Sequence, residues 1–200
     1  KRSAYGWVFK MRDQLGGFSL RKPVLWLDID GTVRHSVEQL GRFVKIAADV
    51  VVFREVPQLL RAYKDAGWRI VGVSNQGGVA LGHLTVHDVY ANMNETMRQC
   101  GGHFDRIGFC CHHPDANEAE MACCWCRKPR IGLLVELGLN LAAQHGECYP
   151  PHMGLFVGDR PEDAQCASNA GLRFMEAIAW RQLDPAHAGR SGDITRADRR

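Results

Sequence analysis

The sequence predicts one α/β domain built around a mainly parallel sheet. Two observations support this prediction: apolar, strand-like runs alternate with helical segments along the chain, and three of these runs end in polar side chains. Parallel strands are covered by helices on both faces, so they are apolar along their whole length. With 200 residues, of which 46% are hydrophobic, the chain is long enough to bury one sizeable core.

The first predicted strand, Val24–Leu27, stops abruptly at two carboxylates. Asp28 and Asp30 follow it, and Gly31 and Thr32 complete the turn. Side chains alternate along a strand, so both carboxylates lie on one face. Acids are costly inside a sheet, and open α/β sheets bind ligands at the carboxyl ends of their strands. The pattern therefore indicates a functional site; the alternative is an ordinary acidic turn after a strand.

The next segments continue the alternation. Residues 56–67 carry apolar side chains at helical spacing and end in a glycine, which predicts a helix. Residues 69–73 form a second apolar run, and it ends at the polar residues Ser74 and Asn75. Residues 85–99 begin with a threonine followed three positions later by an aspartate, which predicts a helix opened by a capping box.

The second half of the chain repeats the pattern. Residues 106–109 are a third apolar run, and a short helix is expected after Pro129, ended by Gly138. A fourth strand is expected at 153–157. The helix after it has proline in its first turn and glycine at its end, over residues 161–171, and a last strand follows at 172–175. Strands and helices in this order predict a single sheet.

The predicted domain spans residues 24–180. A basic and aromatic arm over residues 1–23 precedes it and is expected to pack on the domain, and a polar tail over residues 181–200 is expected to be disordered. The net charge of +3 is mild and does not by itself argue for nucleic-acid binding, which requires a clustered basic face. No apolar stretch has the length of a membrane span.

Cysteines and histidines crowd between positions 110 and 126. The members of this cluster are Cys110, Cys111, His112, His113, Cys123, Cys124 and Cys126. Adjacent cysteines do not readily bridge each other, so the cluster favours a metal over disulfides and thus a reducing, cytoplasmic setting. Cys110, His112, Cys124 and Cys126 offer four ligands for tetrahedral Zn²⁺. Cys111, Cys123 or His113 could replace one of them, and buried apolar cysteines are the structural alternative.

The polar strand ends supply the groups that phosphoryl transfer requires. A carboxylate that attacks a phosphate dianion is repelled by it, so a divalent cation must bridge the two. Asp28 and Asp159 offer hard oxygen ligands for Mg²⁺, and Lys128 offers a cation for phosphate oxygens. Each motif alone has a structural alternative, such as helix capping for Ser74 or a surface helix start for Asp163. All of them in order indicate an active site.

Four motifs in this order resemble those of the haloacid-dehalogenase-like phosphatases. They are Asp-x-Asp-Gly-Thr at 28–32, Ser-Asn-Gln at 74–76, Arg-Lys-Pro at 127–129 and Gly-Asp-x-x-x-Asp at 158–163. The resemblance covers residues 24–175. It implies a Rossmann-like three-layer sandwich and a Mg²⁺-dependent phosphomonoester hydrolase that acts through an aspartyl-phosphate intermediate.

The resemblance also implies roles for the matching residues. Asp28 is the implied nucleophile, and Asp30 is the implied general acid and then general base, with its backbone carbonyl on the metal. The implied phosphate-binding and substrate-binding residues are Thr32, Ser74, Asn75, Arg127 and Lys128. The implied Mg²⁺ ligands are Asp28, Asp30, Asp159 and Asp163.

The wording of the cysteine cluster, Cys-x-His-His-Pro and Cys-x-Cys-Arg-Lys-Pro, resembles the branch of heptose bisphosphate and histidinol phosphatases. In that branch a structural zinc braces a loop beside the active site, and there is no large cap domain. The branch implies a sugar bisphosphate as substrate, with Arg127 contacting its second anionic group. Four places depart from the usual pattern of the branch. Ile29 and Leu81 stand where arginine is common, Val33-Arg34-His35 stands where an asparagine is common, and Gln76-Gly77-Gly78 differs from the usual small and basic residues.

Other functions fit the same motifs. A polynucleotide 3′-phosphatase shares them, and the arm over residues 1–22 is basic, although the zinc ligands argue against this reading. Histidinol phosphatase and a catalytically silent, zinc-braced binding module are further alternatives. We expect a cytoplasmic monomer with bound Mg²⁺ and Zn²⁺, which acts on a small phosphorylated substrate and contacts neither membrane nor nucleic acid.

Overall fold

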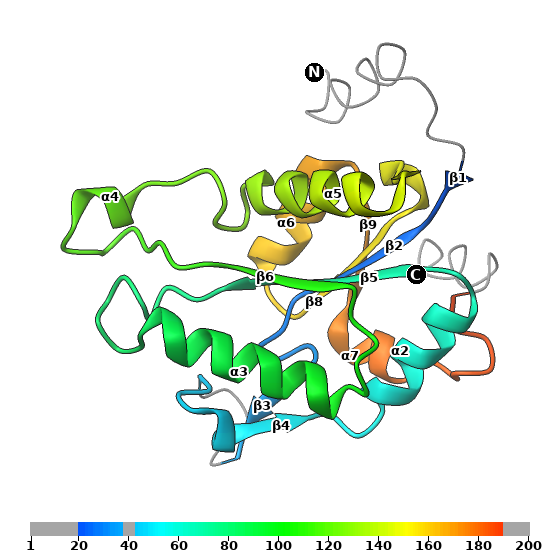
Figure 1. The fold of residues 1–200 in the computed structure, drawn as a ribbon, viewed down its shortest axis with the longest axis horizontal. Coiled ribbons are helices and arrows are strands. Elements are labelled where there is room, and N and C mark those ends of the chain that lie inside the picture. The colour runs from blue at the N-terminus through cyan, green and yellow to red at the C-terminus, as the bar shows by residue number, and fades with distance from the viewer. Residues whose placement is uncertain (1–19, 38–42, 190–200) are drawn as a thin grey trace, which may run out of the picture.

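A five-stranded parallel sheet forms the centre of the computed structural model, which describes residues 20–37 and 43–189 (Figure 1). The strand order is β6-β5-β2-β8-β9. The strands are β2 (Val24–Leu27), β5 (Arg69–Asn75), β6 (Arg106–Cys110), β8 (Leu155–Gly158) and β9 (Arg173–Glu176). The chain winds outward from β2 in one direction and then returns to add β8 and β9 on its other side. The carboxyl end of β2 therefore lies where the strand order reverses, which is where open α/β sheets bind ligands.

Helices cover both faces of the sheet. One face carries α2 (Val56–Asp65), α3 (Val86–Gln99) and α7 (Ala177–Arg181), and the other carries α5 (Gly132–His145) and α6 (Pro161–Ala170). Figure 1 shows these two layers on either side of the strands, with the short helix α4 (Ala119–Ala122) in a loop beyond the sheet. The predicted three-layer α/β fold without a large cap domain is confirmed.

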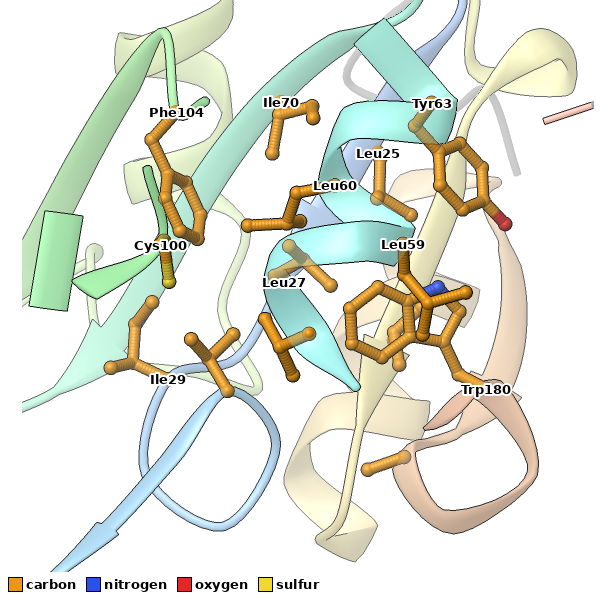
Figure 2. Close-up of a cluster of buried hydrophobic side chains, with 14 of the residues drawn as sticks. Leu25, Leu27, Ile29, Leu59, Leu60, Tyr63, Ile70, Cys100, Phe104 and Trp180 are labelled. Carbon is orange, nitrogen blue, oxygen red and sulfur yellow. The ribbon is translucent and has the colours of Figure 1, made fainter. Parts of the chain in front are cut away.

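The alternation of β2 divides the core into two clusters. Leu25 and Leu27 point to the face of α2, where they join Leu60, Tyr63 and Trp180, all at most 1% exposed (Figure 2). Trp26, one position away, is buried in a second cluster formed by α5 and α6. Because both faces of β2 are buried, the strand is apolar in every position, as the sequence predicted.

Local signals placed most helix ends correctly. Thr85 and Asp88 form the predicted capping box, with Asp88 N donating to Thr85 Oγ1 at 3.1 Å. The predicted end of the helix after Pro129 was wrong, because α5 continues through Gly138 to His145. Gly138 faces Trp26, whose ring would lie 3.8 Å from an added Cβ, so this glycine lies against the sheet inside the helix. Gly146, at φ 62°, ends the helix instead.

Short elements complete the fold. A two-stranded antiparallel pair, β3 (Arg34–Ser36) and β4 (Val50–Val52), follows the first turn, with a 3₁₀ turn at Ala47–Asp49. Before the first central strand, β1 (Leu20–Arg21) pairs in parallel with β7 (Glu147–Cys148). A 3₁₀ turn at Pro151–Met153 precedes β8.

The predicted arm and tail are only partly described. Residues 1–19 of the arm and 190–200 of the tail lie outside the described residues. The described part of the tail packs on the domain, since Trp68 Nε1 donates to the carbonyl of Gly189 at 2.9 Å. Within the described ranges, no helix is long and apolar enough to cross a membrane.

Candidate active site

Asp28 lies directly after β2 and is 6% exposed. Its backbone N–H donates to Val157 of β8 at 2.9 Å, which fixes the carboxyl at the middle of the sheet edge. Oδ1 lies 2.5 Å from Lys128 Nζ, whereas Oδ2 is buried and has no hydrogen-bond partner among the described residues. Burial raises the pKa of Asp28 from 3.8 to about 7, even though Lys128 opposes this shift.

The side chain of Lys128 lies between the carboxylates of Asp28 and Asp163. Its Nζ lies 2.5 Å from Asp28, 2.7 Å from Asp163 Oδ1 and 2.9 Å from the carbonyl of Val73. Burial alone would lower the pKa of this ammonium, but the two carboxylates outweigh burial and raise it. Lys128 is therefore a fixed, buried cation beside the predicted nucleophile.

Asn75 holds Lys128 in place. Its Oδ1 accepts a hydrogen bond from Lys128 N at 3.0 Å, and its Nδ2 donates to Lys128 O at 3.1 Å. An amide that bonds both backbone groups of one residue fixes the direction from which the ammonium enters the site. The polar end of β5 and the Arg-Lys-Pro motif thus form one unit, although 53 positions separate them.

Three carboxylates form a candidate cation site. Oxygens of Asp28, Asp159 and Asp163 all lie within 4.8 Å of one another. Asp28 Oδ2, which is buried without a partner, is the kind of atom that a cation would satisfy. Hard oxygen ligands suit Mg²⁺, so these residues fit the predicted metal. Gly31, at φ 92°, passes so close to Asp159 that any Cβ would overlap its carboxylate.

Asp30 is paired with Arg34, which lies in a segment where the sequence departs from the usual pattern of the branch. Arg34 Nε donates to Asp30 Oδ1 at 2.8 Å, and Gln76 Nε2 donates to Oδ2 at 2.6 Å. Ser74 Oγ lies 3.4 Å from the same oxygen. Arg34 itself is fully buried. The predicted acid is therefore held by three side chains, of which only Ser74 was a predicted site residue.

The partners of Arg34 lie on α3. Its Nη1 donates to Thr96 Oγ1 at 2.8 Å and to the carbonyl of Asn92 at 2.9 Å. A buried guanidinium needs such partners for all of its donors. The signal in the sequence was an arginine four positions after Asp30, but its partners on α3 are about 60 positions away. Ile29, another departure, is fully buried in the core.

A small pocket opens at this edge of the sheet. Six predicted residues line it: Asp28, Asp30, Ser74, Asn75, Lys128 and Asp163. Phe43, Arg160 and Glu162, which were not predicted, complete its described wall. Thr32 and Arg127 are not among its described lining residues. Thr32 is fully buried, and Arg127 Nη1 donates to the carbonyl of His112 at 3.0 Å.

The four predicted zinc ligands meet in a second cluster. Cys110, His112, Cys124 and Cys126 have their ligand atoms within 4.8 Å of one another. Cys110 Sγ lies 3.7 Å from Cys124 Sγ and 3.5 Å from His112 Nδ1, and Cys126 Sγ lies 3.4 Å from the same nitrogen. Ligands of one tetrahedral zinc are about 3.7 Å apart, so the donor set fits this metal. Cys111, Cys123 and His113 are not part of the group.

The zinc cluster is joined to the active site through the chain itself. Cys126 is followed by Arg127 and Lys128, and Arg127 N donates to Cys124 Sγ at 3.3 Å. A backbone N–H that points at a ligand sulfur orients that ligand and the residues after it. The position of Lys128 therefore depends on the geometry of the cysteine loop.

Known proteins match this chain over most of its length. Residues 23–200 match the family described as polynucleotide kinase 3 phosphatase. The D-glycero-β-D-manno-heptose-1,7-bisphosphate 7-phosphatase of Yersinia pestis is 34% identical over 162 residues, covering 75% of this chain and 77% of that protein. The D-glycero-D-manno-heptose-1,7-bisphosphate 7-phosphatase of Chlorobaculum tepidum is 29% identical over 153 residues, with 75% of each covered.

A solved structure shows the same architecture. The D,D-heptose 1,7-bisphosphate phosphatase of B. bronchiseptica, complexed with magnesium and phosphate, has a TM-score of 0.60 and 26% identity, covering 76% of this chain and 78% of that one. The fold, the order of the motifs and the relatives agree. The chain belongs to the polynucleotide kinase 3 phosphatase family, and it is a phosphatase of the haloacid-dehalogenase type from the branch of the heptose bisphosphate phosphatases.

Proposed function

We propose that this protein hydrolyses a small phosphorylated metabolite, a sugar bisphosphate of the heptose type, through an aspartyl-phosphate on Asp28. The observation that carries the proposal is the buried Asp28–Lys128–Asp163 cluster beside Asp159, in which Asp28 Oδ2 has no partner among the described residues. The relatives from Yersinia pestis and Chlorobaculum tepidum, which are named for a heptose bisphosphate, support this substrate class.

In the first half of the proposed reaction, a carboxylate oxygen of Asp28 attacks phosphorus and the bond to the leaving oxygen breaks. Lys128, 2.5 Å from Asp28, offsets the negative charge of the transferring group. Asp30 gives its proton to the leaving oxygen, and Ser74 and Asn75 contact the phosphate. The second half reverses the role of Asp30, which takes a proton from the water that attacks the phosphorylated Asp28.

Mg²⁺ would be held by the carboxylates of Asp28, Asp159 and Asp163 and by the carbonyl of Asp30. When bound, it supplies positive charge that lets the carboxylate and the phosphate dianion approach each other. The relative from B. bronchiseptica was solved with magnesium and phosphate, which agrees with this role. Asp163 also binds Lys128 at 2.7 Å, so it would link the metal to the phosphate-binding cation.

Zn²⁺ would be structural. Cys110, His112, Cys124 and Cys126 fill all four positions of a tetrahedral site, so no position remains for a reacting water. We also propose a reducing, cytoplasmic location, because the cysteine cluster is arranged to hold a metal rather than to form disulfides.

The test is turnover of a substrate panel by the purified protein with Mg²⁺. Heptose 1,7-bisphosphate should be cleaved with a higher kcat/KM than histidinol phosphate, nucleotides or a 3′-phosphorylated oligonucleotide. Preferred cleavage of the oligonucleotide would instead establish the activity for which the family is named. Absence of turnover on every compound, including para-nitrophenyl phosphate, would establish a binding module without catalysis.

A further inference from the structure

Three residues outside the predicted set line the phosphate pocket; we call two of them, Phe43 and Arg160, the mouth of the pocket, and the third is Glu162. Phe43 and Arg160 line the pocket together with Asp28 and Lys128. The Arg160 guanidinium lies over the Phe43 ring, with its carbon 5.5 Å from the ring centre. Asp28 and Lys128 line the part of the pocket where the phosphate would react, so a leaving group that extends away from them can reach Phe43 and Arg160. The pair is thus placed to contact the part of the substrate that is not the reacting phosphate.

The position of Phe43 is fixed by its neighbours in the chain. Val44 is buried, and the fully buried Asn92 of α3 donates through Nδ2 to the carbonyls of Val44 at 3.4 Å and Lys45 at 3.2 Å. The ring of Phe43 is nevertheless 61% exposed. What distinguishes Phe43 from other exposed apolar residues is its place in the pocket lining and its contact with Arg160.

The guanidinium of Arg160 forms only a weak ion pair with Glu162. Its Nη1 lies 3.8 Å from Glu162 Oε1, and both side chains are more than 30% exposed, so this ion pair is long and open to solvent. Arg127, the residue predicted to bind a second anion, has its Nη1 committed to the carbonyl of His112 at 3.0 Å. Of these two arginines, only Arg160 is among the described residues that line the pocket.

We propose that Arg160 and Phe43 determine substrate preference. Arg160 binds a second anionic group of the substrate, and the Phe43 ring packs against the C–H face of the leaving group. A guanidinium suits this role because it can offer two parallel donors to a phosphate while it stacks on an aromatic ring. This assignment rests on the proposed phosphatase function and adds to it the residues that recognise the bisphosphate.

The test compares substrates with and without a second anion. For the wild type and for Arg160→Gln, kcat/KM is measured with heptose 1,7-bisphosphate and with para-nitrophenyl phosphate, and the ratio of the two values is taken. Loss of one charge-assisted contact should lower this ratio about tenfold or more in Arg160→Gln. Arg160→Lys should restore part of it. Phe43→Leu should raise the KM for the bisphosphate.

Two matched variants sharpen the comparison. Lys45→Gln removes an exposed cation, two positions after Phe43, that is not among the described lining residues of the pocket, so it should leave the ratio unchanged. Arg127→Gln tests the other arginine. A ratio that falls with Arg127→Gln or Lys45→Gln but not with Arg160→Gln overturns the assignment, and so does an equal loss on both substrates.

Failure of the proposed substrate gives a different result. If heptose 1,7-bisphosphate is not cleaved while para-nitrophenyl phosphate is, the sugar specificity is wrong, and inhibition of the aryl phosphate reaction tests Arg160. Fructose 1,6-bisphosphate should then inhibit the wild type more strongly than fructose 6-phosphate does. In Arg160→Gln, the ratio of the two inhibition constants should shrink about tenfold. Equal inhibition of the wild type by both sugars overturns the inference.

Discussion

Burial of Asp28 disfavours the ionised form of its carboxyl, although Lys128 partly compensates. Burial raises its pKa to about 7, and its Oδ2 finds no partner among the described residues. A protonated carboxyl is a poor nucleophile and a poor metal ligand, so loss of this proton and binding of a cation are linked. The same burial that excludes water from the reacting carboxylate thus makes its ionisation depend on the metal.

We expect the affinity of the phosphate-free protein for Mg²⁺ to fall as the pH falls through 7. Below the pKa of about 7 the cation must displace a proton from Asp28, whereas above it the carboxylate is already ionised. For one linked proton, the dissociation constant should be about tenfold larger at pH 6 than at pH 8. Calorimetric titration at both pH values measures it. Asp28→Asn, which has no proton to lose there, should show a smaller dependence.

Substitution of the two predicted catalytic carboxylates should separate their roles. Asp28→Asn should abolish hydrolysis, because an amide does not form the phosphorylated enzyme. Asp30→Asn should lower kcat on the order of 10²–10⁴-fold through loss of the proton transfer. Both are measured with para-nitrophenyl phosphate, and circular dichroism checks that the variants are folded. Near-normal turnover by Asp28→Asn would exclude the aspartyl-phosphate.

Helix α7 contacts the turn at Gly31 and Thr32, which follows the two predicted catalytic carboxylates. Arg181, its last residue, donates through Nη1 to the carbonyls of Gly31 at 2.8 Å and Thr32 at 2.9 Å. Its guanidinium also lies over the Phe53 ring, 4.0 Å from the ring centre. Arg181 thereby supplies a donor to two backbone carbonyls of the turn that follows Asp30.

Arg181→Met should loosen this turn while the apolar stem still covers Phe53. The loss of two hydrogen bonds from a charged donor should lower the free energy of unfolding by about 2 kcal/mol. Because the turn also carries Asp30, the Mg²⁺ concentration for half-maximal activity should rise several-fold. Thermal unfolding and a Mg²⁺ titration of activity measure these effects, and Arg181→Lys serves as the conservative control. An unchanged Mg²⁺ requirement would limit Arg181 to a role in stability.

The cysteine loop depends on its metal for structure. Its four ligands are close together, whereas most residues between His113 and Met121 are at least partly exposed and polar. Cys124→Ser should therefore release zinc and raise the KM, because Lys128 follows the cluster directly. Mg²⁺ binding should be largely kept. Elemental analysis should find about one zinc per chain in the wild type. An active protein without zinc, whose four ligands titrate freely, would contradict the site.

The two metals should be separable in the whole protein. EDTA should abolish activity, and Mg²⁺ alone should restore it while zinc remains bound to its thiolates. Ca²⁺ as the sole added divalent ion should support little turnover, because its larger and looser coordination places nucleophile and phosphate poorly. Activity assays after metal exchange, with zinc measured in parallel, test this. Full activity with Ca²⁺ would count against a Mg²⁺ site at Asp28 and Asp159.

The fold could be predicted because its signals are local. The apolar strand Val24–Leu27, the capping box at Thr85 and the glycine at 171 each act within a few positions, and all are confirmed. Gly138 misled the prediction, because a glycine that ends a helix and one that packs against Trp26 look the same in sequence.

The second layer of the active site could not be predicted in the same way. Gln76 reaches Asp30 across 46 positions, and Arg181 reaches the turn across about 150. The pairing of Arg34 with Thr96 likewise exists only once α3 packs on the first turn. Motif order placed the side chains that would touch phosphate, while the residues that hold them in place depend on tertiary contacts.

Asn92 gives α3 a further property. Its backbone carbonyl accepts a hydrogen bond from Arg34, which in turn binds Asp30. Its side-chain Nδ2 donates to the carbonyl of Val44, beside Phe43. Asp30, through Arg34, and the backbone beside Phe43 are therefore both hydrogen-bonded to one residue of α3. A substitution that displaces Asn92 would thus disturb the proton donor and the mouth of the pocket together, although the two lie in separate segments of the chain.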